Sequence, residues 1–246
     1  MASSLRKRRR AVRAAVDGDV YAMLHAPRYA ELLALLDDYV QADSRVLDIG
    51  RSRLTGLIKD TFGVAVDSLG FAKNGPTAEG TNYWYDLNLA QHEDKWRRDI
   101  PAYDVVVMAE VIEHLYTAPL LVLRFLRTIV ADGGVLVVQT PNATALHKRA
   151  KMLVGRHPFE KIREDITNPG HFREYTRREL ESVAREAGFD VERWMAKSYF
   201  DYRYVAALHG TPDNHKLRAA GTLLNAAYVA VPPRLRPGQT LVLRKG

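Results

Sequence analysis

The chain has 246 residues, of which 47% are hydrophobic and 26% charged, a balance typical of a globular protein rather than a disordered or fibrous one. It has no cysteine, which excludes disulfides and thiolate metal sites and agrees with a cytoplasmic location, which we expect. The net charge of +7 would attract anionic partners, but the only dense basic run, residues 6–10, is more typical of a solvated helix start than of a nucleic-acid-binding arm.

The most apolar stretch of the chain, residues 120–138, is interrupted by charged residues and by a glycine pair. A membrane-spanning helix needs about 20 consecutive apolar residues, so we predict no membrane span. The basic start of the chain is followed by Arg13, Asp17 and Asp19 rather than by the apolar segment of a signal peptide.

Residues 11–40 predict a helical lead-in, because apolar residues recur there at the spacing of one helix face. From Arg45 onward, short apolar runs alternate with helical stretches, which is typical of β-α units and a parallel sheet. Helices are predicted at 143–154 and at 177–187, the latter between Thr176 as N-cap and Gly188 as C-cap. Strands are predicted at residues 46–49, 64–67, 83–86, 105–108, 135–138, 191–199 and 240–244.

These elements predict one α/β domain over residues 1–246, with a Rossmann-like, seven-stranded, mostly parallel sheet and helices on both faces. A helical lead-in (1–44) precedes the core (45–199), and an aromatic and proline-rich insertion (200–238) precedes the last strand (239–246). The sequence leaves the oligomeric state open, and a homodimer is one possibility.

Three predicted strands carry an aspartate at or near the carboxyl end, the edge where open α/β sheets bind ligands. Asp48 leads to Gly50, where a backbone without Cβ lets a ligand approach closely. Asp67 follows 19 residues after Asp48, and an acid at the end of the second strand can accept both hydroxyls of a ribose. Asp86 closes the third run.

The segment Arg45-Val46-Leu47-Asp48-Ile49-Gly50 resembles the first motif of class I, Rossmann-like S-adenosylmethionine-dependent methyltransferases. The segments 103–115 and 133–142 continue the series of that family in its proper order, and the resemblance covers about residues 45–192. It differs from the family at the first turn, where Ser52 and Leu54 stand in place of alternating glycines.

The resemblance implies S-adenosylmethionine as cofactor, with its methionine part at the turn of Asp48, Gly50 and Ser52 and its ribose at Asp67. It further implies adenine contacts by Asp86 and Leu87 and a place for Ala109 in the same site. A nicotinamide-dependent oxidoreductase would instead need a glycine-rich turn for pyrophosphate, and here Leu54 replaces the glycine that allows close packing.

Methyl transfer to a hydroxyl needs alignment and removal of a proton, so the sequence should offer a base. Glu110, Glu113 and His114 follow the fourth strand, and in a helix their spacing would gather them on one face. A similar Glu-x-x-Glu-His arrangement occurs in O-methyltransferases of ubiquinone biosynthesis, which implies a divalent metal, Mg²⁺ or Mn²⁺ for carboxylates, with Zn²⁺ tolerated by the imidazole. The alternative is that Glu113 and His114 pack locally without a metal.

His171 is the second candidate, because similar methyltransferases carry a histidine at this place that faces the active site. It can act as base or as a further metal ligand. The residues thus predict O-methylation of a small acceptor, either a saccharide or a phenol. The alternatives are a non-catalytic cofactor-binding relative and an RNA or N-methyltransferase. We expect the acceptor pocket in the lead-in, the loop 146–172 and the insertion, with contributions from Tyr199, Phe200, Tyr202, Tyr204, His209, His147 and His157.

Overall fold

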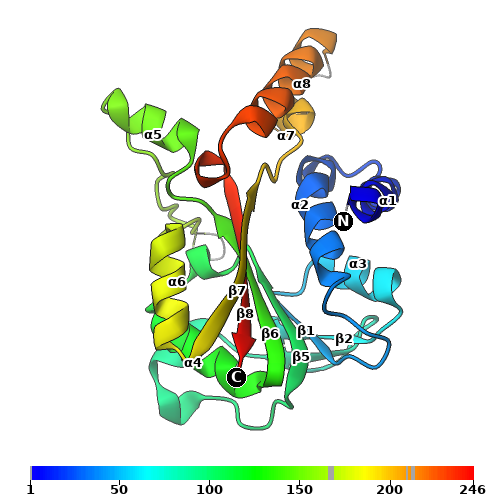
Figure 1. The fold of residues 1–246 in the computed structure, drawn as a ribbon, viewed down its shortest axis with the longest axis vertical. Helices are drawn as coiled ribbons and strands as arrows, with labels where there is room; N and C mark the ends of the chain where they lie inside the picture. The colour runs from blue at the N-terminus through cyan, green and yellow to red at the C-terminus, as the bar shows by residue number, and fades with distance from the viewer. Residues whose placement is uncertain (1, 166–168, 209, 212–213) are drawn as a thin grey trace. The chain divides into compact units, whose positions relative to one another are not determined.

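The structure is a computed structural model that describes residues 2–165, 169–208, 210–211 and 214–246 (Figure 1). The chain divides into two compact units. Unit 1 comprises Met1–Tyr39 and Lys197–Arg236, and unit 2 comprises Val40–Ala196 and Pro237–Gly246. The lead-in and the insertion therefore belong to the same unit. No helix among the described residues is long and apolar enough to cross a membrane.

Unit 2 contains a mostly parallel sheet, which confirms the predicted fold class. Its strand order is β3-β4-β2-β1-β5-β6-β8-β7, in which β4, β2, β1, β5 and β6 run parallel. β3 is antiparallel to β4, and β8 is antiparallel to β6. The short β3 is the strand that the sequence did not predict. The bounds are β1 (Val46–Ile49), β2 (Val66–Gly70), β3 (Gly75–Pro76), β4 (Thr81–Trp84), β5 (Tyr103–Ala109), β6 (Val130–Pro141), β7 (Phe189–Lys197) and β8 (Gly238–Lys245).

The helices of unit 2 cover both faces of this sheet. Chain order reverses at β1, which lies between β2 and β5, and right-handed crossovers then put α3 (Arg53–Phe62) and α4 (Pro119–Ile129) on opposite faces. Figure 1 shows α6 (Arg177–Glu186) on the side of α4. Thr176 and Glu179 form the capping box of α6, as predicted for its start. α5 (Leu146–Leu153) and the short helices η1 (Leu87–Gln91), η2 (Glu93–Lys95) and η3 (Ile112–His114) complete the unit.

The second strand starts later than predicted. β2 begins at Val66, which lies level with Val46 of β1, and it continues through the polar Ser68 to Gly70. The buried Ser68 hydroxyl donates a hydrogen bond to Asn82 Oδ1 on β4, at 2.7 Å. Because this bond satisfies a polar side chain inside the sheet, the strand extends beyond the apolar run from which it was predicted.

Unit 1 is helical. It contains α1 (Ala2–Ala15), α2 (Val20–Leu36), η4 (Tyr202–Tyr204), α7 (Val205–Leu208), α8 (His215–Ala230) and η5 (Pro233–Leu235). The side chain of Asp19 caps α2, which buries most of its apolar residues. The backbone N–H of Asp201 donates to the carbonyl of Leu24 at 2.7 Å, which ties the segment before η4 to α2.

Candidate functional site

The turn after β1 is held by its own polar side chains. Gly50 has φ +80°, and a Cβ there would lie 3.3 Å from Cγ2 of Val111. Ser52 caps α3, its N–H donates to Thr55 Oγ1 at 3.0 Å, and that hydroxyl donates to the buried Asp48 carboxylate at 2.6 Å. Asp48 and Ser52 therefore fix the turn, and Gly50 packs closely against Val111, while its contact with a ligand stays a prediction.

Asp67 requires a correction. It is the second residue of β2, level with Leu47, and does not end the strand as predicted. Its carboxylate accepts hydrogen bonds from the Tyr103 hydroxyl and the Thr81 N–H, both at 2.7 Å. With Val46, Val64 and Tyr103 it lines a recess at the amino ends of β1 and β2. The residues that follow β2, 71–74, include no acid. The predicted ribose contact assumed that Asp67 ends its strand, and the structure does not place it there.

Three further predicted cofactor residues lie at or just beyond the carboxyl ends of β4 and β5. Asp86 follows β4 by two residues, and its Oδ1 accepts from the N–H and the side-chain amide of Asn88, at 2.9 and 3.0 Å. Leu87 is buried directly beyond it. Ala109 is the last residue of β5, the neighbour of β1. Because these strands run parallel, the structure gathers Gly50, Asp86 and Ala109 at one edge of the sheet.

Glu110 does not share a helix with Glu113 and His114, so the predicted helical face is wrong. Its φ of 57° is the left-handed conformation that few residues other than glycine adopt. Its N–H donates to the carbonyl of Gln139 on β6 at 2.7 Å, and the helical turn η3 begins only at Ile112. The β5–β6 pairing thus continues through Glu110 and directs its backbone away from the helical path.

A cluster of acidic and imidazole side chains forms instead from Glu113, His114 and His171. Each offers one possible ligand atom, and these atoms lie within 4.8 Å of one another. Glu113 is fully buried and accepts from the Thr140 hydroxyl at 2.8 Å. The two imidazole rings meet edge to face, with their centroids 4.7 Å apart. The structure therefore brings the three predicted catalytic residues together, and within the described residues Glu110 is not part of this group.

The structure adds two charged residues that the sequence did not indicate. Lys148 of α5 and Glu174 form an ion pair in which both side chains are more than 90% buried. Glu174 Oε1 also lies 3.2 Å from Nδ1 of His171. In the sequence, only the three-residue spacing of His171 and Glu174 could have indicated that these two side chains meet. Lys148 supplies the positive charge that two buried carboxylates require.

Burial controls the protonation of this cluster. It lowers the pKa of His171 to about 4, assisted by the charges of His114 and Lys148. Burial also lowers the pKa of His114, against the opposing effect of its hydrogen bond to the Gly170 carbonyl. The pKa of Lys148 falls to about 8, again chiefly by burial, although Glu110 and Glu113 counteract this effect. At neutral pH both imidazoles are therefore neutral and Lys148 is mostly charged.

An open cavity of about 730 Å³ is lined in part by the residues that directly follow His114 and His171 in the chain, Leu115 and Phe172. Tyr116 and Phe172, both exposed, meet edge to face in its wall at 5.9 Å between centroids. The sequence did not indicate this pair. Of the residues expected in the acceptor pocket, His147 and His157 belong to unit 2, Tyr199, Phe200, Tyr202 and Tyr204 belong to unit 1, and His209 is outside the described residues.

The edge around Gly50 carries groups of the kinds that S-adenosylmethionine would need at its two ends. Gly50 presents backbone without a Cβ, and Asp86 and Leu87 present an acceptor and an apolar surface of the kind that adenine requires. Residues 71–74, directly after β2, supply no carboxylate for the ribose.

Comparisons with known proteins find methyltransferases. A family model described as a methyltransferase domain matches residues 23–193. A "probable S-adenosylmethionine-dependent methyltransferase" of Mycolicibacterium smegmatis is 37% identical over 89 residues, which are 36% of this chain and 29% of that protein. The match thus spans less than a third of the relative's length.

Among solved structures, a SAM-dependent methyltransferase from Archaeoglobus fulgidus is 14% identical, with a TM-score of 0.52 over 88% of this chain and 94% of that one. A geranyl diphosphate C-methyltransferase from Streptomyces coelicolor, crystallised with Mg²⁺, geranyl diphosphate and S-adenosylhomocysteine, is 11% identical, with a TM-score of 0.54 over 92% and 82%. At these identities the two structures show a shared fold.

Proposed function

The chain belongs to the methyltransferase domain family and is an S-adenosylmethionine-dependent enzyme, and from this premise we propose that it methylates a hydroxyl of a small acceptor, a saccharide or a phenol. The observation that supports oxygen as the acceptor is the cluster of Glu113, His114 and His171. An amine or a thiolate acceptor needs less help in losing a proton, so a proton-accepting cluster would contribute less to its methylation.

Hydrogen bonds assign the tautomers of both histidines. Nδ1 of His114 lies 2.9 Å from the Gly170 carbonyl oxygen, which can only accept, so this nitrogen carries the proton. Nδ1 of His171 faces the Glu174 carboxylate, which is paired with Lys148. Nε2 is therefore the lone-pair nitrogen of each ring. This is the atom that accepts a proton or binds a metal, and a carboxylate behind His171 is the usual support for either role.

The low pKa of His171, about 4, makes it a weak base for an alcohol. A hydroxyl is a far weaker acid than an imidazolium, so transfer of its proton to His171 alone is strongly uphill. A divalent cation between Glu113, His114 and His171 would supply a charge that acidifies the acceptor. Metal assistance is therefore part of the proposal. His171 would bind the cation, or would act as the base if the enzyme uses no cation.

The donor set bears on the choice of metal. The sequence predicted two carboxylates and one imidazole, a set suited to Mg²⁺ or Mn²⁺. The cluster has one carboxylate and two imidazoles, which are better ligands for Mn²⁺ or Zn²⁺ than for Mg²⁺. Mn²⁺ suits both sets and is the cation we expect.

S-adenosylmethionine, when bound, supplies an electrophilic methyl group. The protein then has to hold the acceptor oxygen in line with that group and take its proton. The turn at Gly50, with Asp86, Leu87 and Ala109, would bind the cofactor at one edge of the sheet. Glu113 and His114 follow β5 at that same edge. For this reason we assign removal of the acceptor's proton to their cluster.

The test is a methyl-transfer assay over a panel of saccharides and phenols, with and without EDTA. We expect EDTA to abolish turnover, Mn²⁺ to restore it, and Glu113→Gln to remove the response to Mn²⁺ while cofactor binding persists. The matched control is Glu186→Gln, which changes an exposed carboxylate on α6 and should behave as wild type. Full activity in EDTA would contradict the metal and leave His171 as the proton acceptor. Transfer only to amines would contradict O-methylation itself.

A further inference from the structure

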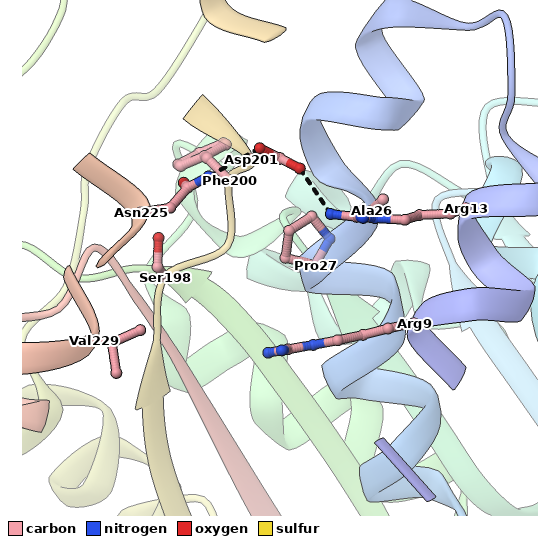
Figure 2. Close-up of a pocket in the computed structure, with 9 residues that line it drawn as sticks. All are labelled: Arg9, Arg13, Ala26, Pro27, Ser198, Phe200, Asp201, Asn225 and Val229. Carbon is pink, nitrogen blue, oxygen red and sulfur yellow. Dashed lines mark hydrogen bonds and ion pairs between the residues drawn. The ribbon is translucent and has the colours of Figure 1, made fainter. Parts of the chain in front are cut away.

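Unit 1 contains a cavity of about 230 Å³ whose lining residues all belong to that unit (Figure 2). Arg9 and Arg13 of α1 reach it from one side, and Pro27 of α2 lies beside them. Phe200 and Val229 provide apolar surface on the segment after β7 and on α8. The cavity thus combines two cationic side chains with an apolar wall, and none of its residues belongs to the cluster of Glu113, His114 and His171.

Both guanidinium groups keep most of their donors available. Arg9 Nη2 donates to Glu31 at 2.8 Å, and Arg13 Nη2 donates to Asp201 at 3.1 Å. Among the described residues neither side chain has another hydrogen bond, although a guanidinium has five N–H donors. Each side chain is also 56% exposed. A ligand in the cavity can therefore reach several unused donors of both arginines.

Asp201 holds one side of the cavity in place. Its side chain is 3% exposed and accepts from Arg203 Nε at 2.8 Å and from Asn225 Nδ2 at 2.9 Å. A dashed line in Figure 2 marks a further hydrogen bond to this carboxylate, from Arg13. Because Arg203 and Asn225 fix the carboxylate, Asp201 offers Arg13 an ordered partner beside the cavity.

The charges around the cavity favour an anion with two negative charges. Glu31 contacts Arg9 and, at 3.7 Å, Lys197, while Asp201 contacts Arg13 and Arg203. These two ion-pair groups, which include Arg9 and Arg13, together hold four cations and two carboxylates, an excess of two positive charges. The same bias holds for the unit as a whole. Unit 1 has 13 basic and 7 acidic residues, and unit 2 has 23 and 22. Nearly all of the chain's net charge of +7 therefore lies in unit 1.

We propose that this cavity binds the phosphate monoester group of a small phosphorylated molecule. Arg9 and Arg13 bind the phosphate oxygens, since the planar guanidinium matches phosphate geometry, and a dianion balances the local excess of charge. Pro27, Phe200 and Val229 contact the organic part of the ligand. The volume is below the roughly 300–1,000 Å³ of pockets for drug-sized ligands, so the ligand is small. This site is independent of the proposed function, because it is defined by binding and not by turnover.

The test is calorimetry on the full chain with glucose 6-phosphate, glucose and glucuronate, which differ in the anionic group on one sugar. The probe variant is Arg9→Gln with Arg13→Gln. The control is Arg6→Gln with Arg10→Gln, which removes the same charge from exposed positions of the same helix. We expect binding of glucose 6-phosphate but not of glucose. The probe variant should lose at least tenfold in affinity, and the control should stay within about twofold of wild type.

Three results would overturn the proposal. Equal losses in the two double variants would mean general attraction by a basic helix rather than a site. Tighter binding of glucuronate than of glucose 6-phosphate would show that the site does not select a phosphate group. Absence of binding to wild type at roughly 10 mM glucose 6-phosphate would reject the site for sugar phosphates altogether. Unchanged S-adenosylhomocysteine binding and circular dichroism in both variants show that neither loss reflects unfolding.

Discussion

Replacing Gly50 by alanine tests whether the turn after β1 receives the cofactor. Gly50 has φ +80°, a conformation that costs a residue with a Cβ about 1–2 kcal/mol. The new Cβ would also lie 3.3 Å from Cγ2 of Val111, close enough that the neighbour must shift by a few tenths of an ångström. We expect Gly50→Ala to lose about 1–2 kcal/mol of unfolding free energy and at least tenfold in affinity for S-adenosylhomocysteine.

Gly63→Ala is the matched control, because it separates strain from ligand contact. Gly63 ends α3 with φ +70°, and a Cβ there meets nothing within 4 Å. The two variants should therefore lose similar amounts of stability in denaturant titrations, while only Gly50→Ala weakens cofactor binding in calorimetry. Wild-type affinity in a folded Gly50→Ala protein would refute the placement of the cofactor at this turn.

Two further predictions concern Asp67 and His25. Asp67→Asn should change S-adenosylhomocysteine affinity by less than about threefold and lower the melting temperature, because the carboxylate bonds Tyr103 and Thr81 at the amino end of β2; a loss of tenfold or more would return Asp67 to the cofactor site. Burial among Tyr21, Tyr29 and Phe200 lowers the pKa of His25 to about 3, with Arg28 contributing. Because the unfolded histidine binds a proton at higher pH than the folded one, its contribution to stability is fully present above pH 6.5 and is lost as the pH falls toward 3, on the order of 5 kcal/mol in total. His25→Phe should therefore flatten the pH dependence of unfolding free energy in denaturant titrations between pH 4 and 7 (a range set by that shift), and identical slopes for variant and wild type would contradict the assignment.

The sequence predicted the parts of the fold that depend on local patterns. Apolar runs located β1, β5 and β6, and the capping residue Thr176 located the start of α6. The bounds of β2 were misplaced, because the strand starts at Val66 and continues through Ser68 to Gly70, and these bounds depend on pairing with β1 and β4. That all 246 residues act as a single domain stays a prediction.

The candidate site was less predictable because it depends on contacts between distant segments. The helical spacing of Glu110, Glu113 and His114 was the natural interpretation, but pairing of Glu110 with Gln139 on β6 prevents that helix. His171 was predicted from resemblance alone. The pairing of Lys148 with Glu174 joins residues 26 apart in the chain, and no local pattern indicates it.

Titration of S-adenosylhomocysteine into the wild-type protein by calorimetry tests the central claim most directly. Ser52 and Leu54 replace glycines in the turn, and residues 71–74 directly after β2 include no acid for the ribose, so we expect fewer charge-assisted hydrogen bonds to the cofactor. We predict one site per chain with a dissociation constant in the micromolar range. A nanomolar constant would show that these substitutions cost nothing, and absence of binding at millimolar concentration would contradict the assignment of this chain as an S-adenosylmethionine-dependent enzyme.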